Sequence, residues 1–286
     1  MSEAAALSSG KGHKDENFPV ASIIIARQHR PAILAFYNFV RVADDVSDSE
    51  TAAPDEKLRL LEDMRLSLMG ASEASSEGVA LRNVLMERGL VTDHAADLLE
   101  AFRRDVVKLR YADWGELIDY CRYSAMPVGR YVLDVHEEGQ GAWPLNDALC
   151  AALQVINHLQ DCGKDYRKLN RVYLPQDVMA KYGAQVEDLA GETSTPALKA
   201  VITELAARNA ELLNQSAAFA VHIRDKRLSL EVAIIQRLAE DLNTRLLTRD
   251  PLCDRVHHQK AELPGLLLSA FGRFLATCLF PGRKVA

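Results

Sequence analysis

One segment carries the strongest structural signal in the chain: Leu149-Cys-Ala-Ala-Leu-Gln-Val-Ile-Asn-His-Leu-Gln-Asp-Cys-Gly-Lys-Asp165. Apolar side chains recur in it at helical spacing, which predicts a largely buried helix. Asn157, Asp161 and Asp165 follow one another four residues apart, so three oxygen-bearing side chains lie along one face of this helix. Carboxylates on a buried helix are costly unless they are paired or bind a metal ion. The stretch therefore predicts a helical protein with a polar site inside it.

A second acidic cluster, Arg41-Val-Ala-Asp44-Asp45-Val-Ser-Asp48, ends another apolar helical stretch. Asp44 and Asp48 share a face, and carboxylates at the C-terminal end of a helix dipole are locally unfavourable. A divalent cation would offset their charge, and Mg²⁺ prefers carboxylate oxygens and also binds phosphates. Together the two clusters predict Mg²⁺ ions that bridge a diphosphate between facing helices. The alternative is that both are solvated acidic helix ends.

The rest of the chain also follows a helical pattern, with no strand-like alternation and no visible linker. A short helix is predicted up to Arg30 and a new one from Pro31, because proline fits the first turn of a helix. Further helices are predicted from Pro54 and over 79–89, 92–109, 114–136 with a kink at Pro127, 144–166, 175–182, 195–219, 228–248 and 264–278. We predict one all-α domain over 17–286, preceded by a disordered segment over 1–16.

Composition excludes several other classes of protein. The net charge is −6 and basic residues form no block with aromatic ones, which argues against a nucleic-acid partner. The five cysteines include no CxxC pair, as expected for reduced thiols in the cytoplasm. No apolar signal region follows the N-terminus, and the apolar stretch 264–280 is shorter than the ~20 residues that span a bilayer. We therefore expect a cytoplasmic protein.

These motifs resemble those of the squalene/phytoene synthase family, from Asn17 to about Leu247. The family's first acidic motif is matched by Tyr37, Arg41, Asp44, Asp45 and Asp48. Its second acidic motif and the R-x-Y-L-P that follows are matched by Asn157, Asp161, Asp165, Arg171, Tyr173, Leu174 and Pro175. Between them, the segment from Tyr120 to Gly129 stands where the family has its Y-x-x-x-x-A-G-x-V-G helix.

The resemblance implies an isoprenoid-synthase-type helical barrel with a central cavity. It implies that the Mg²⁺–diphosphate is bound by Asp44, Asp45, Asp48, Asp161 and Asp165. Arg41 and Arg171 would contact the diphosphate, and Tyr37, Tyr120 and Tyr173 would face cationic intermediates. A tyrosine or Asn157 would hold the water that ends the reaction.

Two departures from the family pattern point to one branch of it. The spacing from Asp165 to Arg171 is one residue longer than in most members, and Asn170 stands where the family usually has Gly. In the central helix, Met126 stands where the family has Gly and is followed by Pro127. These features resemble the bacterial hopanoid-pathway branch, in which presqualene diphosphate and water yield hydroxysqualene and diphosphate without NADPH. No Gly-rich dinucleotide fingerprint is present, as expected if no reductive step occurs. The alternatives are condensation of two prenyl diphosphates and, more remotely, a non-catalytic subunit of a lipid-synthesis complex.

Three features stay open at this level. Asp105 is either an acidic residue of the site or a partner in a surface ion pair with Arg104 or Lys108. His158 is expected to pack or to form a supporting hydrogen bond. The apolar tail from Leu266 either packs as a terminal helix or docks transiently on the inner face of the membrane. Neighbouring enzymes of the squalene pathway are further expected partners.

Overall fold

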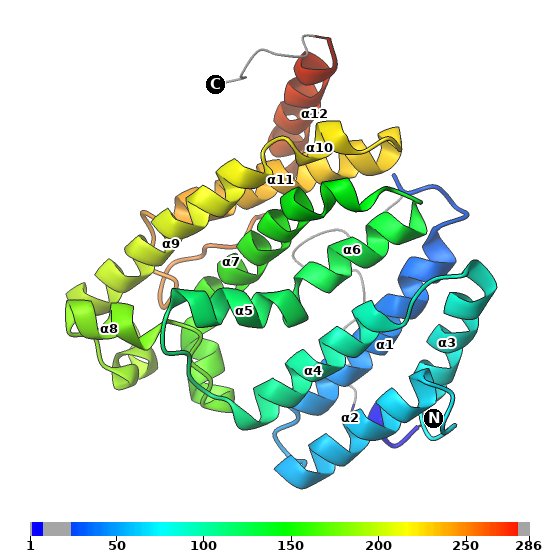
Figure 1. Ribbon diagram of the computed structural model, residues 1–286. Coiled ribbons are helices and arrows are strands. Elements are labelled where there is room, and N and C mark those ends of the chain that lie inside the picture. Colours follow the sequence, from blue (N-terminus) through cyan, green and yellow to red (C-terminus); the bar gives the residue numbers. More distant parts are fainter. Residues whose placement is uncertain (1, 8–23, 280–286) are drawn as a thin grey trace.

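A computed structural model describes residues 2–7 and 24–279 (Figure 1). Its elements are η1 (Ala4–Leu7), α1 (Arg30–Asp48), α2 (Pro54–Leu68), α3 (Ser76–Arg88), α4 (Asp93–Val107), α5 (Trp114–Ser124), α6 (Met126–Val135), η2 (Gln140–Ala142), α7 (Trp143–Leu169), α8 (Gln176–Tyr182), η3 (Val186–Ala190), α9 (Pro196–Ser216), α10 (Phe219–His222), α11 (Lys226–Leu246) and α12 (Leu263–Leu279). No strand occurs in these residues, apart from an isolated bridge between Arg110 and Val172. The all-α prediction is confirmed.

Helix α7 forms the centre of the fold. It packs against α5, α6, α9 and α11, and Figure 1 shows it crossing the middle of the molecule. Its apolar side chains, such as Leu149, Ile156 and Leu159, are buried in one core shared with the surrounding helices. One face of α7 is thus fixed by packing, and its polar face is held against the opposite helices.

Helix α1 supplies the opposite wall. It packs against α2, α3 and α4, and it meets α6 where the rings of Phe36 and Tyr131 stack with centroids 4.0 Å apart. The Tyr131 hydroxyl donates a hydrogen bond of 3.0 Å to the carbonyl of Ala32. These contacts fix the position of the acidic end of α1 relative to α7.

Proline marks most helix starts as predicted, including Pro54 at the start of α2. The predicted kink at Pro127 is a complete break, because α5 ends at Ser124 and α6 begins at Met126. The predicted short helix up to Arg30 is wrong for 24–29, which form bends and turns. The Arg30 side chain donates a hydrogen bond to the carbonyl of Ile25 there. This carbonyl thus accepts from a side chain, where in a helix it would accept from a backbone amide.

Helix α4 ends at Val107, two residues before the predicted end, because the following residues pair with a distant segment. The amides of Val172 and Gln176 donate to the carbonyls of Leu109 and Tyr111 over 3.0 and 2.9 Å. This pairing fixes the residues that follow α7.

Within the predicted disordered segment 1–16, residues 2–7 are ordered. Ala4 is buried, and the Ser2 hydroxyl donates to the Glu77 carboxylate over 2.8 Å. Residues 8–16 lie outside the described residues. Among the described helices, none is long and apolar enough to cross a membrane.

Candidate active site between α1 and α7

Two pockets lie side by side between α1 and α7. The first, here called the acidic pocket, has a volume of about 410 Å³ and is lined by Tyr37, Val40, Arg41, Asp44, Asp48, Phe102, Asp105, Tyr120, Ser124, Val128, Gln154, Asn157, His158, Asp161, Asp165, Leu169, Arg171 and Tyr173. The second, the apolar pocket, has a volume of about 300 Å³ and lies between α1, α6, α7 and α11. Tyr37, Val40 and Val128 line both pockets. These boundary residues join a charged chamber to a hydrocarbon-lined one.

The two predicted acidic rows face the same chamber. Asp44 and Asp48 reach it from α1, and Asp161 and Asp165 from α7. Burial, and then the neighbouring Asp161, raise the pKa of Asp165 to about 7. Burial and then Asp48 likewise raise the pKa of Asp44. The arrangement holds more negative charge than its surroundings offset, as expected of a site for a cation.

Asp45, predicted with the other ligands, lies outside the lining of either pocket. It is buried, and its carboxylate accepts a 2.6 Å hydrogen bond from Nη2 of Arg41. Nη1 of Arg41 lies 2.9 Å from the Asp44 carboxylate. Asp45 therefore holds Arg41 at the edge of the acidic pocket.

Arg171 ties three parts of the chain together. Nη1 lies 2.5 Å from Asp48, Nη2 donates to the carbonyl of Ser47 over 2.9 Å, and Nε donates to the backbone carbonyl of Asp105 over 3.0 Å. The preceding residue, Asn170, has a φ of 52° at the C-cap of α7. Asparagine tolerates this left-handed conformation, which explains how it replaces the glycine usual in the family.

Two of the three predicted tyrosines, Tyr120 and Tyr173, converge on a carboxylate that the motifs did not identify. The hydroxyls of Tyr120 and Tyr173 donate to the two oxygens of Asp105 over 2.7 and 3.0 Å. The Tyr111 ring packs against both tyrosines, with centroids 5.3 and 5.6 Å away. Burial raises the pKa of Tyr120 and Tyr173 well above 10, so both hydroxyls keep the protons that they donate.

Asp105 itself is 5% exposed and is therefore no partner in a surface ion pair. Arg104 instead pairs with Glu100 and Asp119 over 3.2 and 3.3 Å. Burial raises the pKa of the Asp105 carboxyl to about 6, while Arg171 and the tyrosine hydroxyls oppose that rise. Of the two interpretations that the sequence left open, the surface ion pair is wrong, and Asp105 lines the acidic pocket.

His158 also lines the acidic pocket. Its ring stacks on Tyr173 with centroids 3.6 Å apart, and Nε2 lies 3.2 Å from Nε2 of Gln154. Burial, with Arg171 nearby, lowers the pKa of His158 to about 3, so the ring is neutral. Asn157, the first residue of the predicted stripe, lines the same pocket. His158 packs as predicted, and it does so inside the site.

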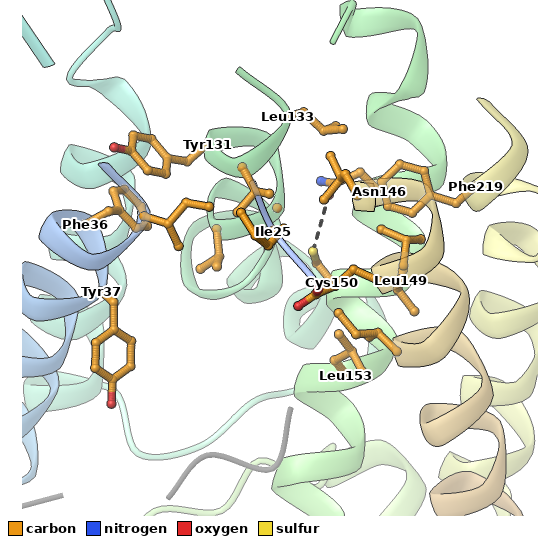
Figure 2. A pocket seen from close by; sticks show the side chains of 18 of the residues that line it. Ile25, Phe36, Tyr37, Tyr131, Leu133, Asn146, Leu149, Cys150, Leu153 and Phe219 are labelled. Atoms are coloured by element: carbon orange, nitrogen blue, oxygen red, sulfur yellow. Dashed lines mark hydrogen bonds between the residues drawn. The ribbon is translucent and has the colours of Figure 1, made fainter. Parts of the chain in front are cut away.

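The wall of the apolar pocket consists mostly of aliphatic and aromatic side chains, several of which Figure 2 labels, together with Asn146, Cys150 and Glu231. Phe36 reaches it from α1, Leu149 and Leu153 from α7, and Phe219 from α10. The break between α5 and α6 brings Val128 and Gly129 into its wall. A Cβ on Gly129 would lie 1.9 Å from Oδ1 of Asn146, so only glycine permits this close approach of α6 to α7.

The joined pockets suit an amphiphilic molecule. The acidic pocket offers five carboxylates and two guanidinium groups, which can hold metal ions and an anion together. The apolar pocket can hold a hydrocarbon chain and keep water away from it. Bond cleavage at the boundary would leave the anion in the first chamber and a carbocation facing the second.

The chain is similar in sequence to proteins of known family. The family model described as squalene/phytoene synthase matches residues 11–264. The chain is 55% identical over 276 residues to the hydroxysqualene synthase of Zymomonas mobilis, covering 96% of this chain and 93% of that relative. It is 55% identical over 272 residues to the hydroxysqualene synthase of Rhodopseudomonas palustris, covering 95% of this chain and 92% of the relative.

Solved structures share the fold. A squalene synthase from Alicyclobacillus acidocaldarius matches with a TM-score of 0.72 and 28% identity, over 85% of this chain and 91% of the other. A dehydrosqualene synthase matches with a TM-score of 0.77 and 21% identity, over 96% of each chain. The isoprenoid-synthase-type helical fold is thereby confirmed, and the chain belongs to the squalene/phytoene synthase family.

Proposed function

We propose that this chain converts presqualene diphosphate and water into hydroxysqualene and diphosphate. Relatives that are 55% identical over nearly their whole length are hydroxysqualene synthases. The observation that carries the proposal is the junction of a carboxylate-lined pocket with an apolar one at three shared residues. Water rather than hydride ends this reaction, so it consumes no NADPH.

Mg²⁺ fits the acidic pocket because the pocket offers carboxylate oxygens, the ligands that hard cations prefer. Asp44, Asp48, Asp161 and Asp165 are the residues that would hold it. When bound there, the ion would neutralise the diphosphate and so make it a better leaving group. Arg171 and Arg41 would contact the diphosphate oxygens through their guanidinium groups. We propose that Asp45 contributes by orienting Arg41, given their 2.6 Å hydrogen bond.

The tyrosines would favour the carbocation with their electron-rich ring faces. Tyr120 and Tyr173 are held by Asp105, whose negative charge adds to this effect. Tyr37 lines both pockets, so it and Asn157 are the candidates to hold the water that attacks the cation. We favour Tyr37, because it stands at the boundary where the cation forms.

Product composition would separate these two candidates. In Tyr37→Phe, a cation that no longer meets a positioned water should lose a proton instead, so that alkene products increase relative to the alcohol. Asn157→Leu serves as the matched variant. If only Asn157→Leu changes the ratio of alcohol to alkene, the assignment of the water to Tyr37 is wrong.

The function itself is tested by incubating the purified chain with presqualene diphosphate and Mg²⁺, without NADPH, in water labelled with a heavy oxygen isotope. We expect one labelled oxygen in a hydroxysqualene product. Asp161→Asn should remove the activity while the helix content stays unchanged. If Asp161→Asn forms the labelled product as fast as the wild type, the metal role of Asp161 is contradicted, while the proposed reaction still stands.

Condensation of two prenyl diphosphates is the second candidate, because relatives in the same family include phytoene synthases at 28% identity. Incubating the chain with farnesyl diphosphate alone tests this candidate. If the chain consumes farnesyl diphosphate, condensation replaces the proposed reaction as its function. A non-catalytic role is disfavoured by the five carboxylates gathered in one pocket.

We also propose that α12 docks transiently on a membrane surface, where a lipid substrate would be met. Figure 1 shows α12 projecting from the body, and it packs on α11 through Ala270, Ile234 and Leu238. Four of its apolar side chains are exposed, by 42% at Leu267, 73% at Leu268, 45% at Phe271 and 42% at Leu275. Such a face suits the interface of a bilayer.

Co-sedimentation with vesicles of phosphatidylethanolamine and phosphatidylglycerol tests this docking. Replacing Leu268 and Phe271 by glutamate should abolish binding, whereas Met86→Glu, at an exposed position of α3, should leave it unchanged. Equal binding by all three proteins would remove α12 from the proposal.

A further inference from the structure

A group of potential metal ligands lies outside both pockets. It combines His29 just before α1, His136 at the C-cap of α6 and Asp225 at the N-cap of α11. One potential ligand atom from each lies within 4.8 Å of the others. The two imidazole rings face each other with centroids 4.2 Å apart. Three distant parts of the sequence thus bring two nitrogen donors and one oxygen donor to one place.

His136 is the strongest indication of a ligand. Its side chain has no exposed surface. Nδ1 lies 2.8 Å from the carbonyl of Val132, so this nitrogen carries the proton and donates it. Nε2 then presents a lone pair, yet it is buried without a hydrogen-bond partner in the described part of the chain. A histidine fixed by a backbone carbonyl at one nitrogen and left open at the other has the usual arrangement of a metal ligand.

Asp225 is oriented in the same way. Its Oδ1 accepts hydrogen bonds from the amides of Arg227 and Leu228 over 2.8 and 3.3 Å, which caps α11. Its own amide donates to the carboxylate of Glu138 over 2.8 Å. Oδ2 lies 3.9 Å from Nε2 of His136, too far for a hydrogen bond between them. One oxygen therefore serves the helix and the other faces the histidines.

His29 completes the group from a turn and is only partly buried. The guanidinium of Arg88 bonds to the neighbouring carbonyl of Gln28, and its positive charge opposes a cation at this place. The carboxylate of Asp225 supplies negative charge on the other side, whereas that of Glu138 is paired with Nε of Arg224 at 3.3 Å. Zinc–nitrogen bonds are about 2.0–2.1 Å long, so the three donors would have to close in slightly. The turn that carries His29 allows that adjustment.

We propose that His29, His136 and Asp225 bind a zinc-class transition-metal ion. Imidazole nitrogens select zinc, cobalt or nickel over magnesium, which separates this site chemically from the all-oxygen acidic pocket. Ile25, Val132 and Leu228 line the apolar pocket, and each lies three or four residues from one ligand. The ion would therefore join the segment before α1 to α6 and α11, and so close that end of the apolar pocket. This inference does not depend on the proposed reaction.

Metal titration of the full chain tests the site. Chelator-treated protein is titrated with Zn²⁺ by calorimetry, and with Co²⁺ by visible absorption, in a large excess of Mg²⁺ that occupies the acidic pocket. We expect one tight site and the intense absorption of low-coordinate cobalt. His136→Gln should weaken the binding by about 100-fold or more, since even a lost supporting contact costs 10–100-fold.

Matched variants keep the result interpretable. Asp225→Asn retains a good helix cap but loses the anionic ligand, so it should fold even where His136→Gln does not. His222→Gln removes an exposed histidine of α10 and should bind as the wild type does. Asp161→Asn should also keep the tight site, because it alters the acidic pocket alone. Absence of a tight site in the wild type, or wild-type affinity in both Asp225→Asn and His136→Gln, would overturn the proposal.

Discussion

Replacing Asp105 by asparagine should make this protein more stable and less active. The two side chains have nearly the same shape, so the substitution removes the charge and leaves the packing intact. Burial raises the pKa of the Asp105 carboxyl from 3.8 to about 6. At about 1.4 kcal/mol per pKa unit, ionising it costs about 3 kcal/mol more in the folded protein than in the unfolded chain.

The sign follows from the direction of the shift. Because the folded pKa is the higher one, the wild type loses this free energy as the pH rises from about 4 to 6, and the loss is complete above 6. Asparagine carries no charge and avoids the loss. It accepts a hydrogen bond from only one of Tyr120 and Tyr173 in the present orientation, which offsets about 1 kcal/mol. At pH 8 the variant should therefore be about 2 kcal/mol more stable.

Activity should fall because the other tyrosine hydroxyl must turn to accept from the amide, and because the negative charge near the cation is lost. We expect at least a tenfold decrease in turnover, equivalent to about 1.4 kcal/mol of transition-state stabilisation. Urea denaturation followed by circular dichroism at pH 8 and pH 5 measures the stability. Asp119→Asn, at a half-exposed aspartate on α5, is the control and should change neither property.

The reasoning is refuted if Asp105→Asn is less stable than the wild type at pH 8 and also retains full turnover. A variant that is stabilised equally at pH 5 and pH 8 would contradict the pH argument. In that case the stability of the wild type would not depend on ionisation of Asp105.

Three further predictions follow from contacts in and around the site. Gly129→Ala should destabilise the fold by about 1–3 kcal/mol, because its Cβ would meet Asn146, whereas Gly139→Ala, with nothing within 4 Å, should not; thermal unfolding compares them. Between pH 7.5 and 5, the wild type should lose about 2 kcal/mol of stability relative to His158→Gln, because the pKa of His158, lowered to about 3 by folding, lets only the unfolded chain take up the proton. Urea titrations at both pH values measure this difference, and an equal change in the two proteins would contradict it. Chelation of Mg²⁺ should abolish turnover without altering helix content, and Mg²⁺ should restore it; activity that survives chelation would exclude the metal role.

Much of the fold was accessible from local pattern. Apolar spacing and proline positions predicted α2, α7 and α9 to within a few residues, because these helices are specified by their own sequence. The end of α4 was missed because residues 109–112 pair with 172–177, and such contacts leave no periodic trace. The turn over 24–29 was missed for a similar reason, since its conformation depends on a side-chain bond from Arg30.

In the candidate site, too, local pattern predicts some residues, and distant contacts determine the others. Four of the five predicted carboxylates of α1 and α7 do face one pocket, because i and i+4 spacing fixes their direction on the helix. Asp45, predicted as a ligand with them, is instead engaged within its own helix, where Nη2 of Arg41 lies 2.6 Å from its carboxylate. Asp105 was uncertain because its partners lie 15 and 68 residues away in sequence. No local pattern could have indicated that two tyrosines share its carboxylate.

The boundary formed by Tyr37, Val40 and Val128 has an evolutionary consequence. Apart from these three residues, the two pockets have separate linings. In the proposed reaction, substitutions deep in the apolar pocket would therefore redirect the carbocation toward another skeleton without altering the residues that release the diphosphate. A single ancestral catalyst could diversify its products in this way while its ionisation chemistry stayed constant.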